Sequence, residues 1–310
     1  MKIACRKALS EELIILGKKN ANIYVVTTDS KGSATLDDFA GEIPNQFIEC
    51  GIAEQNAVGI SGGLASCDNI VFVCSPSPFL SGRSYEQIKI DAVYNNRNVK
   101  LIGISGGFSY GTLGFSHHSL QDISMLRTLP GLTLLVPSDD IQTRALVRIM
   151  SDNYGPMYMR LGRNPVNRIY DEAEKFTIGK SKYLHHGNDV TIMAVGETVW
   201  QALEAAKLLE NINIHATVLD MFSVKPIDKE AIIAAAIQTK RIVTVEEHSI
   251  LGGLGSAVCE IVSQPNPVPI KIIGTPDNHI ISGESPDLYR HFKLTAKDIA
   301  MTVSDWLSTL

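Results

Sequence analysis

Several features that mark particular classes of protein are scarce or missing in this chain of 310 residues. It has only 5 cysteines, widely spaced, a usage that favours reduced core thiols over a disulfide framework or a zinc knuckle. No apolar run approaches the ~20 residues of a membrane span. The first 20 residues carry charges inside their apolar stretch, unlike a signal peptide. We therefore expect a cytoplasmic protein with no membrane contact and no metal site of its own.

Positive charge is not clustered either. The formal net charge is −5, and Lys and Arg are scattered singly, so nucleic acid and anionic membranes are not expected as partners. There is no dinucleotide-binding GxGxxG after a strand, no phosphate-binding GxxxxGK[ST] and no HExxH. The glycines of residues 252–256 open a predicted helix, and we expect them to allow close packing of that helix on a sheet.

Strand-like and helix-like segments alternate along most of the chain. Continuous apolar strands between amphipathic helices indicate a parallel sheet with helices on both faces. The pattern weakens over residues 166–186, a segment with Pro, Asn and charges, and then restarts. We predict an α/β chain of two domains, 1–165 and 187–310, each with a mostly parallel sheet, joined by a linker. The predicted strands span 22–29, 46–50, 69–75, 99–105, 132–138, 156–162, 189–196, 213–220, 241–247 and 268–274, and the predicted helices span 4–19, 53–66, 82–96, 119–130, 139–152, 198–210, 229–237, 252–263 and 296–307.

Open parallel sheets bind ligands beyond the carboxyl ends of their strands, so the loops after strands are the places to look for a site. Glu54 stands just after the strand 46–50, in the first turn of an apolar helix. An acid there also complements the helix macrodipole, so position alone leaves a structural role open. Phe79, Arg83 and Tyr85 follow the next predicted strand, where aromatic side chains either belong to the core or form a platform for a ligand.

Two further loops carry polar side chains. Residues 103–119 contain 5 glycines and the pair His117 and His118. Long ordered loops of this kind tend to be functional, although a histidine pair alone is weak evidence of catalysis. Arg160 and Arg163 flank a strand end and suit either an anion such as phosphate or a structural ion pair.

Taken in order, these segments resemble the carboxyl-terminal section of transketolases. The resemblance covers essentially the whole chain and is closest in layout to split transketolases, in which this section is a separate subunit. It implies a pyrimidine-binding domain, a transketolase C-terminal domain, and transfer of a two-carbon ketol unit between sugar phosphates with thiamine diphosphate as cofactor. The segments that carry it are GIAEQNAVG (51–59), FLSGRSYEQ (79–87), GFSHHSLQDISMLRTLPGLTLLVPSD (114–139), YMRLGR (158–163) and VEEHSILGGLGSAV (245–258).

The resemblance also implies roles for individual residues. Glu54 matches the glutamate that hydrogen-bonds N1′ of the aminopyrimidine and so promotes removal of the thiazolium C2 proton. Phe79 matches an aromatic that stacks on the aminopyrimidine, and Tyr85 is a further candidate to line that pocket. His117 matches a histidine of the substrate channel that contacts sugar hydroxyls, and Arg163 matches an arginine that binds the substrate phosphate.

Some positions depart from the family pattern. Leu113 stands where transketolases carry an Asp that reads the donor's hydroxyls. Ser105 falls near a phosphate-contacting histidine, and an aromatic of the pyrimidine pocket is replaced around Pro76. Arg160 resembles an arginine of the related deoxyxylulose-phosphate synthases and is a second phosphate candidate. We therefore expect thiamine diphosphate chemistry with a donor other than xylulose 5-phosphate.

The diphosphate end of the cofactor has no matching motif in this chain. Thiamine enzymes hold Mg²⁺ and the diphosphate with a GDG motif, whose oxygen ligands suit a hard cation, and no GDG occurs here. The resemblance therefore implies an amino-terminal partner subunit that bears GDG and holds most of the Mg²⁺ and diphosphate. It also implies homodimerisation of this chain and a heterotetramer as the assembly.

Two other interpretations stay open at this level. The beta subunits of 2-oxoacid dehydrogenases share the arrangement, although residues 114–132 fit transketolases better. The chain could also be a structural subunit that kept the fold and lost the chemistry. Retention of Glu54 argues for activity, because a non-catalytic subunit does not need a carboxylate at that place.

Overall fold

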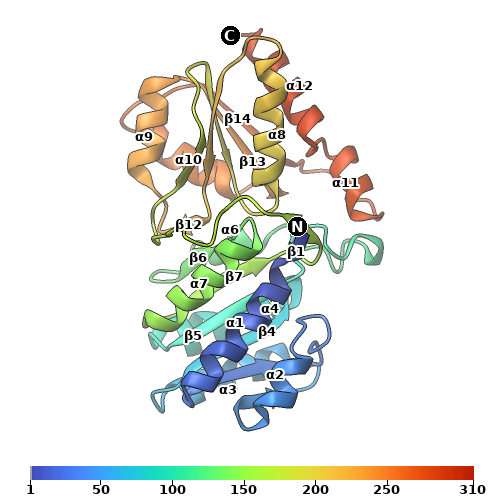
Figure 1. The fold of residues 1–310 in the computed structure, drawn as a ribbon, viewed down its shortest axis with the longest axis vertical. Helices are drawn as coiled ribbons and strands as arrows, with labels where there is room; N and C mark the ends of the chain where they lie inside the picture. Colours follow the sequence, from blue (N-terminus) through green and yellow to red (C-terminus); the bar gives the residue numbers. More distant parts are fainter. Residues whose placement is uncertain (1) are drawn as a thin grey trace.

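The computed structural model describes residues 2–310 and shows two α/β halves stacked end to end, with the amino terminus near their junction and the carboxyl terminus at the far end (Figure 1). The first half is built on a seven-stranded sheet of β2 (Ile23–Thr27), β3 (Phe47–Glu49), β4 (Ile70–Pro76), β5 (Val99–Ile104), β6 (Thr133–Leu135), β7 (Met157–Leu161) and β12 (Ser223–Lys225). Their order is β12-β6-β7-β5-β4-β2-β3, and all are parallel except β12. The predicted α/β class with a mostly parallel sheet is confirmed.

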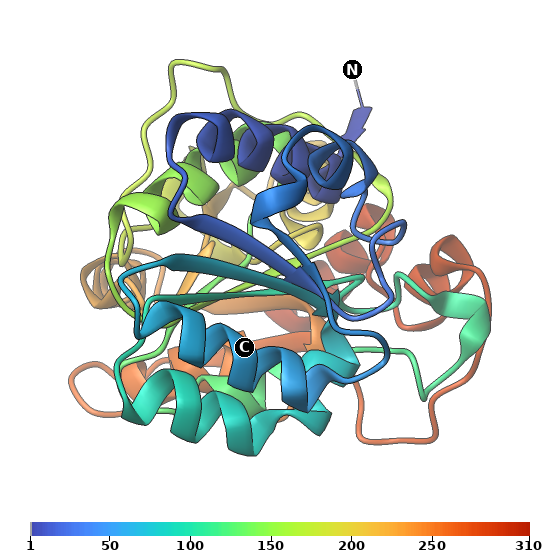
Figure 2. The ribbon, with the colours of Figure 1, turned by 90° about the horizontal axis from the view of Figure 1, so that it is seen from below.

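Helices cover both faces of this sheet, as the view from below shows (Figure 2). They are α1 (Cys5–Lys19), α2 (Asp37–Glu42), α3 (Glu54–Ala65), α4 (Ser77–Arg83), α5 (Tyr85–Gln87), α6 (Asp122–Leu126) and α7 (Asp140–Asp152), with the short turns η1 (Pro44–Gln46) and η3 (Gly111–Leu113) and the π-helical η2 (Ile88–Tyr94). On one face α1 packs against α2 and α7, and on the other α3 packs against α4 and η2. Because both faces are covered, the strands can be almost continuously apolar.

The helical segment predicted over 82–96 begins earlier, at Ser77, and is divided into α4, α5 and η2. Ser77 and Pro78 open α4, since proline fits the first turn of a helix, where an N–H needs no partner. The hydroxyls of Ser81 and Ser84 donate to carbonyls four residues earlier, at 2.7 and 2.8 Å. Such contacts compete with the helical hydrogen bonds and bend helices. The break places the end of α4 beside the start of α3.

The second half contains a five-stranded sheet of β9 (Lys182–His185), β10 (Val190–Ala194), β11 (Ala216–Asp220), β13 (Ile242–Ser249) and β14 (Ile270–Thr275). The order is β14-β13-β10-β11-β9, with all strands parallel except β9. Its helices are α8 (Thr198–Glu210), α9 (Lys229–Gln238), α10 (Leu254–Val262), α11 (Ser285–His291) and α12 (Ala296–Leu307). α8 packs with α12, and α9 packs with α10 (Figure 1). None of the helices in residues 2–310 is long and apolar enough to cross a membrane.

The segment predicted to be a linker, 166–186, contains residues of two short strands. β8 (Pro165–Asn167) pairs with β1 (Lys2–Ala4), and β9 forms an edge of the second sheet. The two halves are joined by β12, which follows β11 of the second half and pairs with β6 of the first. These strands are only three or four residues long, too short for a periodicity signal. The division at 165 and 187 stays a prediction, and the halves are more interwoven than it suggests.

A buried polar layer lies where the two halves meet. Arg160, in β7, is 4% exposed, and its Nη2 donates to the carbonyl of Glu247 in β13 at 2.6 Å. Its Nε lies 3.6 Å from Oδ2 of Asp122, and the hydroxyl of Tyr158 donates to the same oxygen at 2.7 Å. A buried charge without a partner would cost several kcal/mol, roughly 3 to 5. The layer therefore fixes how the halves dock.

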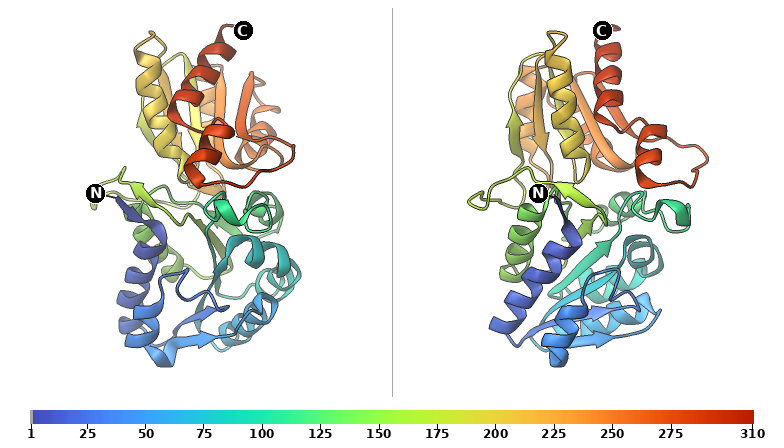
Figure 3. Two further views of the ribbon diagram at one scale, coloured as in Figure 1. Left: turned by 90° about the vertical axis from the view of Figure 1, so that its right-hand side faces the viewer. Right: turned by 45° about the vertical axis from the view of Figure 1, so that its right-hand side comes forward.

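Two loops close the junction on one side: the glycine-rich loop, residues 103–119, and the segment 276–284 between β14 and α11. Side views show the glycine-rich loop, residues 103–119, directly beneath α11 (Figure 3). Ser285, the first residue of α11, donates its hydroxyl to the carbonyl of Phe108 at 2.8 Å. The N–H of Gly283 donates to the carbonyl of Gly111 at 3.3 Å. The second half therefore supports the loop that carries the predicted histidine.

The glycines at the start of α10 allow close packing, as predicted. The carboxylate of Glu246 accepts the N–H groups of Leu254 and Gly255 at 2.7 and 2.8 Å. A Cβ at Gly253 would lie 1.9 Å from that carboxylate, and a Cβ at Gly255 would lie 2.7 Å from Ile272. Only glycine lets this helix end approach the sheet so closely.

Candidate functional site

Glu54 is the first residue of α3 and lies just beyond the end of β3. Its side chain is 5% exposed, and its two carboxylate oxygens lie 3.4 and 3.2 Å from Nη1 of Arg83. A carboxylate so deeply buried requires a donor or a countercharge. Arg83 supplies both in this structure.

Arg83 also contacts the predicted aromatic platform. It is the last residue of α4, one turn beyond Phe79 on the same helix. The carbon at the centre of its guanidinium lies 4.0 Å from the centroid of the Phe79 ring, within the range of a cation–π contact. One planar cation therefore joins Glu54 to Phe79.

The two adjacent histidines of the glycine-rich loop have different environments. His117 is half-buried, and its ring meets that of Phe79 edge to face, with centroids 5.1 Å apart. His118 is 2% exposed, its Nε2 lies 2.9 Å from the carbonyl of Gly111, and its ring packs against Phe108. Burial lowers the pKa of His118. His118 is therefore part of the loop's structure, whereas His117 faces the predicted site.

Tyr110 extends the line of contacts to Arg163. Its ring centroid lies 5.7 Å from that of His117 and 5.2 Å from the central carbon of the Arg163 guanidinium. Its hydroxyl donates to Oγ of Ser33 at 3.2 Å, and the backbone N–H of Arg163 donates to Oγ of Ser109 at 3.2 Å. Tyr110 is therefore anchored at its hydroxyl, and Arg163 at its backbone.

We call this continuous line of contacts the site row: Glu54, Arg83, Phe79, His117, Tyr110 and Arg163. Its members follow β3, β4, β5 and β7, whose carboxyl ends lie along one edge of the first sheet. Parallel strands are expected to present their site residues at this edge. Four predicted site residues, Glu54, Phe79, His117 and Arg163, are brought together here, and Arg83, named in the sequence without a role, lies among them. Tyr110 was not predicted. The sequence feature that could have identified it is an aromatic side chain within the glycine-rich loop.

Tyr85 and Arg160 lie outside the site row. The hydroxyl of Tyr85 is 3.4 Å from Oγ1 of Thr128, and its ring packs against the core of the first half. Arg160 is 4% exposed and is engaged by the junction layer described above. A phosphate cannot reach a guanidinium that is covered in this way. The geometry therefore argues against Arg160 as a phosphate ligand, and we leave it out of the proposed site.

The positions that depart from the family pattern fall in different places. Leu113 is 54% exposed and lines a cavity of about 640 Å³ together with Tyr110 and Arg163. Ser105 is fully buried at the end of β5, with φ of 60° and no hydrogen-bond partner for its hydroxyl among the residues that the structure describes. Pro76 is the buried last residue of β4. Leu113 therefore borders the open space beside Arg163, whereas Ser105 is buried near the start of the glycine-rich loop.

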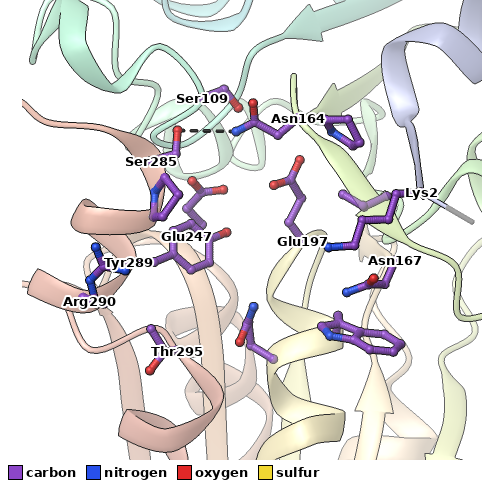
Figure 4. Close-up of a pocket in the computed structure, with 15 residues that line it drawn as sticks. Lys2, Ser109, Asn164, Asn167, Glu197, Glu247, Ser285, Tyr289, Arg290 and Thr295 are labelled. Atoms are coloured by element: carbon purple, nitrogen blue, oxygen red, sulfur yellow. Dashed lines mark hydrogen bonds between the residues drawn. The ribbon is translucent and has the colours of Figure 1, made fainter.

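A second cavity, of about 350 Å³, lies between the two halves (Figure 4). Glu197 and Glu247 point into it, and burial raises the pKa of both carboxyl groups. Nδ2 of Asn164 donates to Oγ of Ser285 at 3.4 Å, and both residues also line the cavity beside Arg163. No member of the site row lines this second cavity. It belongs to the polar junction between the halves.

The part of the site row formed by Glu54, Arg83 and Phe79 fits an aminopyrimidine ring. The guanidinium of Arg83 is planar and carries N–H donors, and it lies against Glu54 and the face of Phe79 at the same time. Glu54 and Phe79 can therefore hold a planar nitrogen-containing ring, one by hydrogen bonding and the other by stacking. Residues 2–310 contain no group of three or more His, Cys, Asp or Glu side chains placed to hold a metal ion.

Comparison with known proteins identifies both halves. Residues 1–168 match the family model of the transketolase pyrimidine-binding domain, and residues 179–299 match that of the transketolase C-terminal domain. The chain is 49% identical, over 98% of each sequence, to a subunit of the apulose-4-phosphate transketolase of Phocaeicola vulgatus. It is 37% identical to a 6-deoxy-6-sulfo-D-fructose transketolase subunit of a Clostridium species, over 93% of this chain and 89% of the relative.

A solved structure supports the same conclusion. A split-gene transketolase, an inactive beta4 tetramer, superimposes with a TM-score of 0.90 at 38% identity, and the match covers 99% of both chains. These matches favour a transketolase over the beta subunit of a 2-oxoacid dehydrogenase. The transketolase family depends on thiamine diphosphate, which agrees with the fit of the site row to an aminopyrimidine. The chain belongs to the transketolase family and is a transferase subunit of a split transketolase.

Proposed function

We propose that this subunit contributes the pyrimidine side of a thiamine diphosphate site, with Glu54 as the acid that faces N1′ and Phe79 as the stacking surface. When bound, the cofactor supplies the nucleophilic carbon and the electron sink for transfer of the two-carbon unit. Glu54 stabilises a proton on the pyrimidine nitrogen, and Phe79 holds the ring plane. The observation that carries the proposal is the joint contact of one planar cation with both side chains.

The part of the site row formed by His117, Tyr110 and Arg163 binds the substrate in this proposal. His117 contacts sugar hydroxyls, and Arg163 binds the terminal anion beside the cavity of about 640 Å³. Two relatives are named for apulose 4-phosphate and for 6-deoxy-6-sulfo-D-fructose. Phosphate and sulfonate are both tetrahedral anions that a guanidinium can bind. We therefore propose an anionic ketose other than xylulose 5-phosphate as the donor.

The rest of the active site lies on a partner in this proposal. The chain contains no GDG motif, and its described residues offer no acidic cluster for a metal ion. An amino-terminal subunit that bears GDG would hold Mg²⁺ and the diphosphate. We propose that two copies of this chain and two of that partner form a heterotetramer in the cytoplasm, with this chain forming the homodimer.

Substitution of Glu54 by Gln in the reconstituted complex tests the assignment. Hydrogen–deuterium exchange at C2 of the bound cofactor should slow by roughly 10²- to 10⁴-fold, the usual contribution of a general acid or base. Glu86→Gln is the matched control, because Glu86 is an exposed acid in the first turn of α5. An unchanged exchange rate in Glu54→Gln would refute the role of Glu54.

Calorimetric titration tests the division of labour between subunits. Thiamine diphosphate should bind weakly to this chain alone and tightly after the partner and Mg²⁺ are added, because most of the binding free energy would come from the metal and the diphosphate. Micromolar binding by the isolated chain would contradict the proposed partner-held diphosphate.

A further inference from the structure

The contact between Arg83 and Glu54 has the geometry of a weak ion pair that can be broken easily. Only Nη1 of the guanidinium reaches the carboxylate, at 3.2 and 3.4 Å. No other hydrogen bond of the Arg83 side chain is found among the described residues. The side chain is 52% exposed, so it has an open path into solvent.

A second pair in this chain shows what a permanent ion pair looks like at the same burial. Arg148 and Glu12 have side chains that are 54% and 2% exposed, nearly the same as Arg83 and Glu54 at 52% and 5%. There the guanidinium bonds through two nitrogens to both oxygens, at 2.8 and 2.7 Å. Two-point pairing of this kind is the stronger form. The chain can therefore build a tight pair, and it does not do so at Glu54.

The position of Arg83 coincides with that required of the cofactor ring. In the proposed function, Glu54 must hydrogen-bond a ring nitrogen and Phe79 must offer its face to the ring. Arg83 uses the same carboxylate oxygens, and its guanidinium lies 4.0 Å from the centroid of the same aromatic ring. Two planar groups cannot occupy this place at once.

We infer that Arg83 is a placeholder for the aminopyrimidine: it occupies the space between Glu54 and Phe79 in the unloaded subunit, and the cofactor must displace it to bind. This inference rests on the proposed function. Until the cofactor binds, Arg83 neutralises the buried carboxylate of Glu54 and covers the ring of Phe79. Displacement costs one loose ion pair and one cation–π contact, so affinity for the cofactor is lowered by a modest factor.

Binding of thiamine diphosphate to the reconstituted complex tests the inference by calorimetry, without any assay of turnover. Arg83→Ala should bind the cofactor roughly three- to tenfold more tightly than the native chain, the range expected for one loose ion pair with a half-exposed cation and one cation–π contact. Arg83→Lys keeps a charge for Glu54 but has no planar group for Phe79, and should fall between the two. Lys89→Ala is the matched control, since Lys89 is an exposed cation in η2, and it should bind like the native chain.

Association kinetics give an independent measurement. If Arg83 must leave first, the observed binding rate of the native complex should level off at high cofactor concentration, and that of Arg83→Ala should not. Thermal unfolding of each variant shows whether it is folded, and Arg83→Lys retains a partner for Glu54 if Arg83→Ala is unstable. Equal or weaker binding by both Arg83 variants would overturn the inference and leave the proposed function standing. Failure of every variant and of the native complex to bind cofactor would overturn the proposed function and this inference with it.

Discussion

The rings of His117 and Phe79 meet edge to face with their centroids 5.1 Å apart. This contact joins the glycine-rich loop, which carries the proposed substrate contacts, to α4, which carries the proposed cofactor platform. An aromatic pair of this geometry contributes roughly 0.5 to 1.5 kcal/mol beyond the area it buries. The order of the loop and the position of Phe79 are therefore coupled. A substitution of His117 should also affect the cofactor platform, and a substitution of Phe79 should also affect the loop.

Substitution of the two adjacent histidines should separate function from stability. His117→Asn should lower kcat/KM of the reconstituted complex about tenfold, the equivalent of one hydrogen bond to a substrate hydroxyl, and should lower the unfolding free energy by no more than the roughly 0.5 to 1.5 kcal/mol of its aromatic pair with Phe79. His118→Asn should lower the unfolding free energy by about 1 to 3 kcal/mol, because His118 is buried and bonded to Gly111. Steady-state kinetics and urea unfolding measure the two effects. Equal losses of stability in both variants would contradict this division.

Arg163 should matter for charged substrates only. Arg163→Ala should raise KM for an anionic ketose about 10- to 100-fold, because a hydrogen bond to a charged group contributes about 1.5 to 3 kcal/mol. The uncharged ketose erythrulose should be used with nearly unchanged kcat/KM. Arg290→Ala serves as control, since Arg290 is exposed and borders the second cavity. A similar loss with erythrulose would show that Arg163 does not act on the anion.

Leu113 should restrict the choice of donor. An apolar side chain beside a substrate hydroxyl leaves that hydroxyl without a partner, at a cost of roughly 1 to 3 kcal/mol. We expect xylulose 5-phosphate to be a poor donor for the native complex and Leu113→Asp to improve its kcat/KM about tenfold. Phe115→Asp is the matched control, because Phe115 is 56% exposed in the same loop, compared with 54% for Leu113, but does not line the cavity. Native activity on xylulose 5-phosphate at ordinary transketolase levels would show that Leu113 does not mark a change of specificity.

Asp220 should make stability depend on pH at the junction of the two halves. Burial raises the pKa of Asp220 to about 6, although hydrogen bonds from Tyr170, Gln142 and Ser138 oppose the shift. As pH rises from about 4 to about 6, the unfolded chain releases this proton while the folded chain retains it. The stabilisation is therefore complete at low pH and is lost as pH rises through the folded-state pKa.

Comparison of Asp220→Asn with the native chain isolates that contribution. The stability advantage of the native chain should shrink by up to about 3 kcal/mol between pH 4 and pH 7, since one pKa unit corresponds to about 1.36 kcal/mol. Urea unfolding at a series of pH values measures the difference between the two free energies. A difference that stays constant over this range would contradict the prediction.

The sequence by itself determined the architecture and the edge at which the site lies. Apolar strands alternate with amphipathic helices, and this pattern can be satisfied only by parallel sheets covered on both faces. Glu54, Phe79, His117 and Arg163 each follow a predicted strand, and the carboxyl ends of parallel strands meet at one edge. The sequence of neighbouring residues is enough to infer both the architecture and the edge that carries the site, because each inference depends only on local patterns and on a general rule of packing.

Only the tertiary structure decided which charged and aromatic side chains take part. Arg160 and Arg163 are three residues apart and look alike in the sequence, yet one is covered by the second half of the molecule and the other borders an open cavity. His117 and His118 are adjacent, and the turn of the loop sends one to Phe79 and the other to Phe108. The reach of Arg83 to Glu54 spans 29 residues of sequence. Burial and long-range contact depend on how distant segments dock, and no local pattern encodes that.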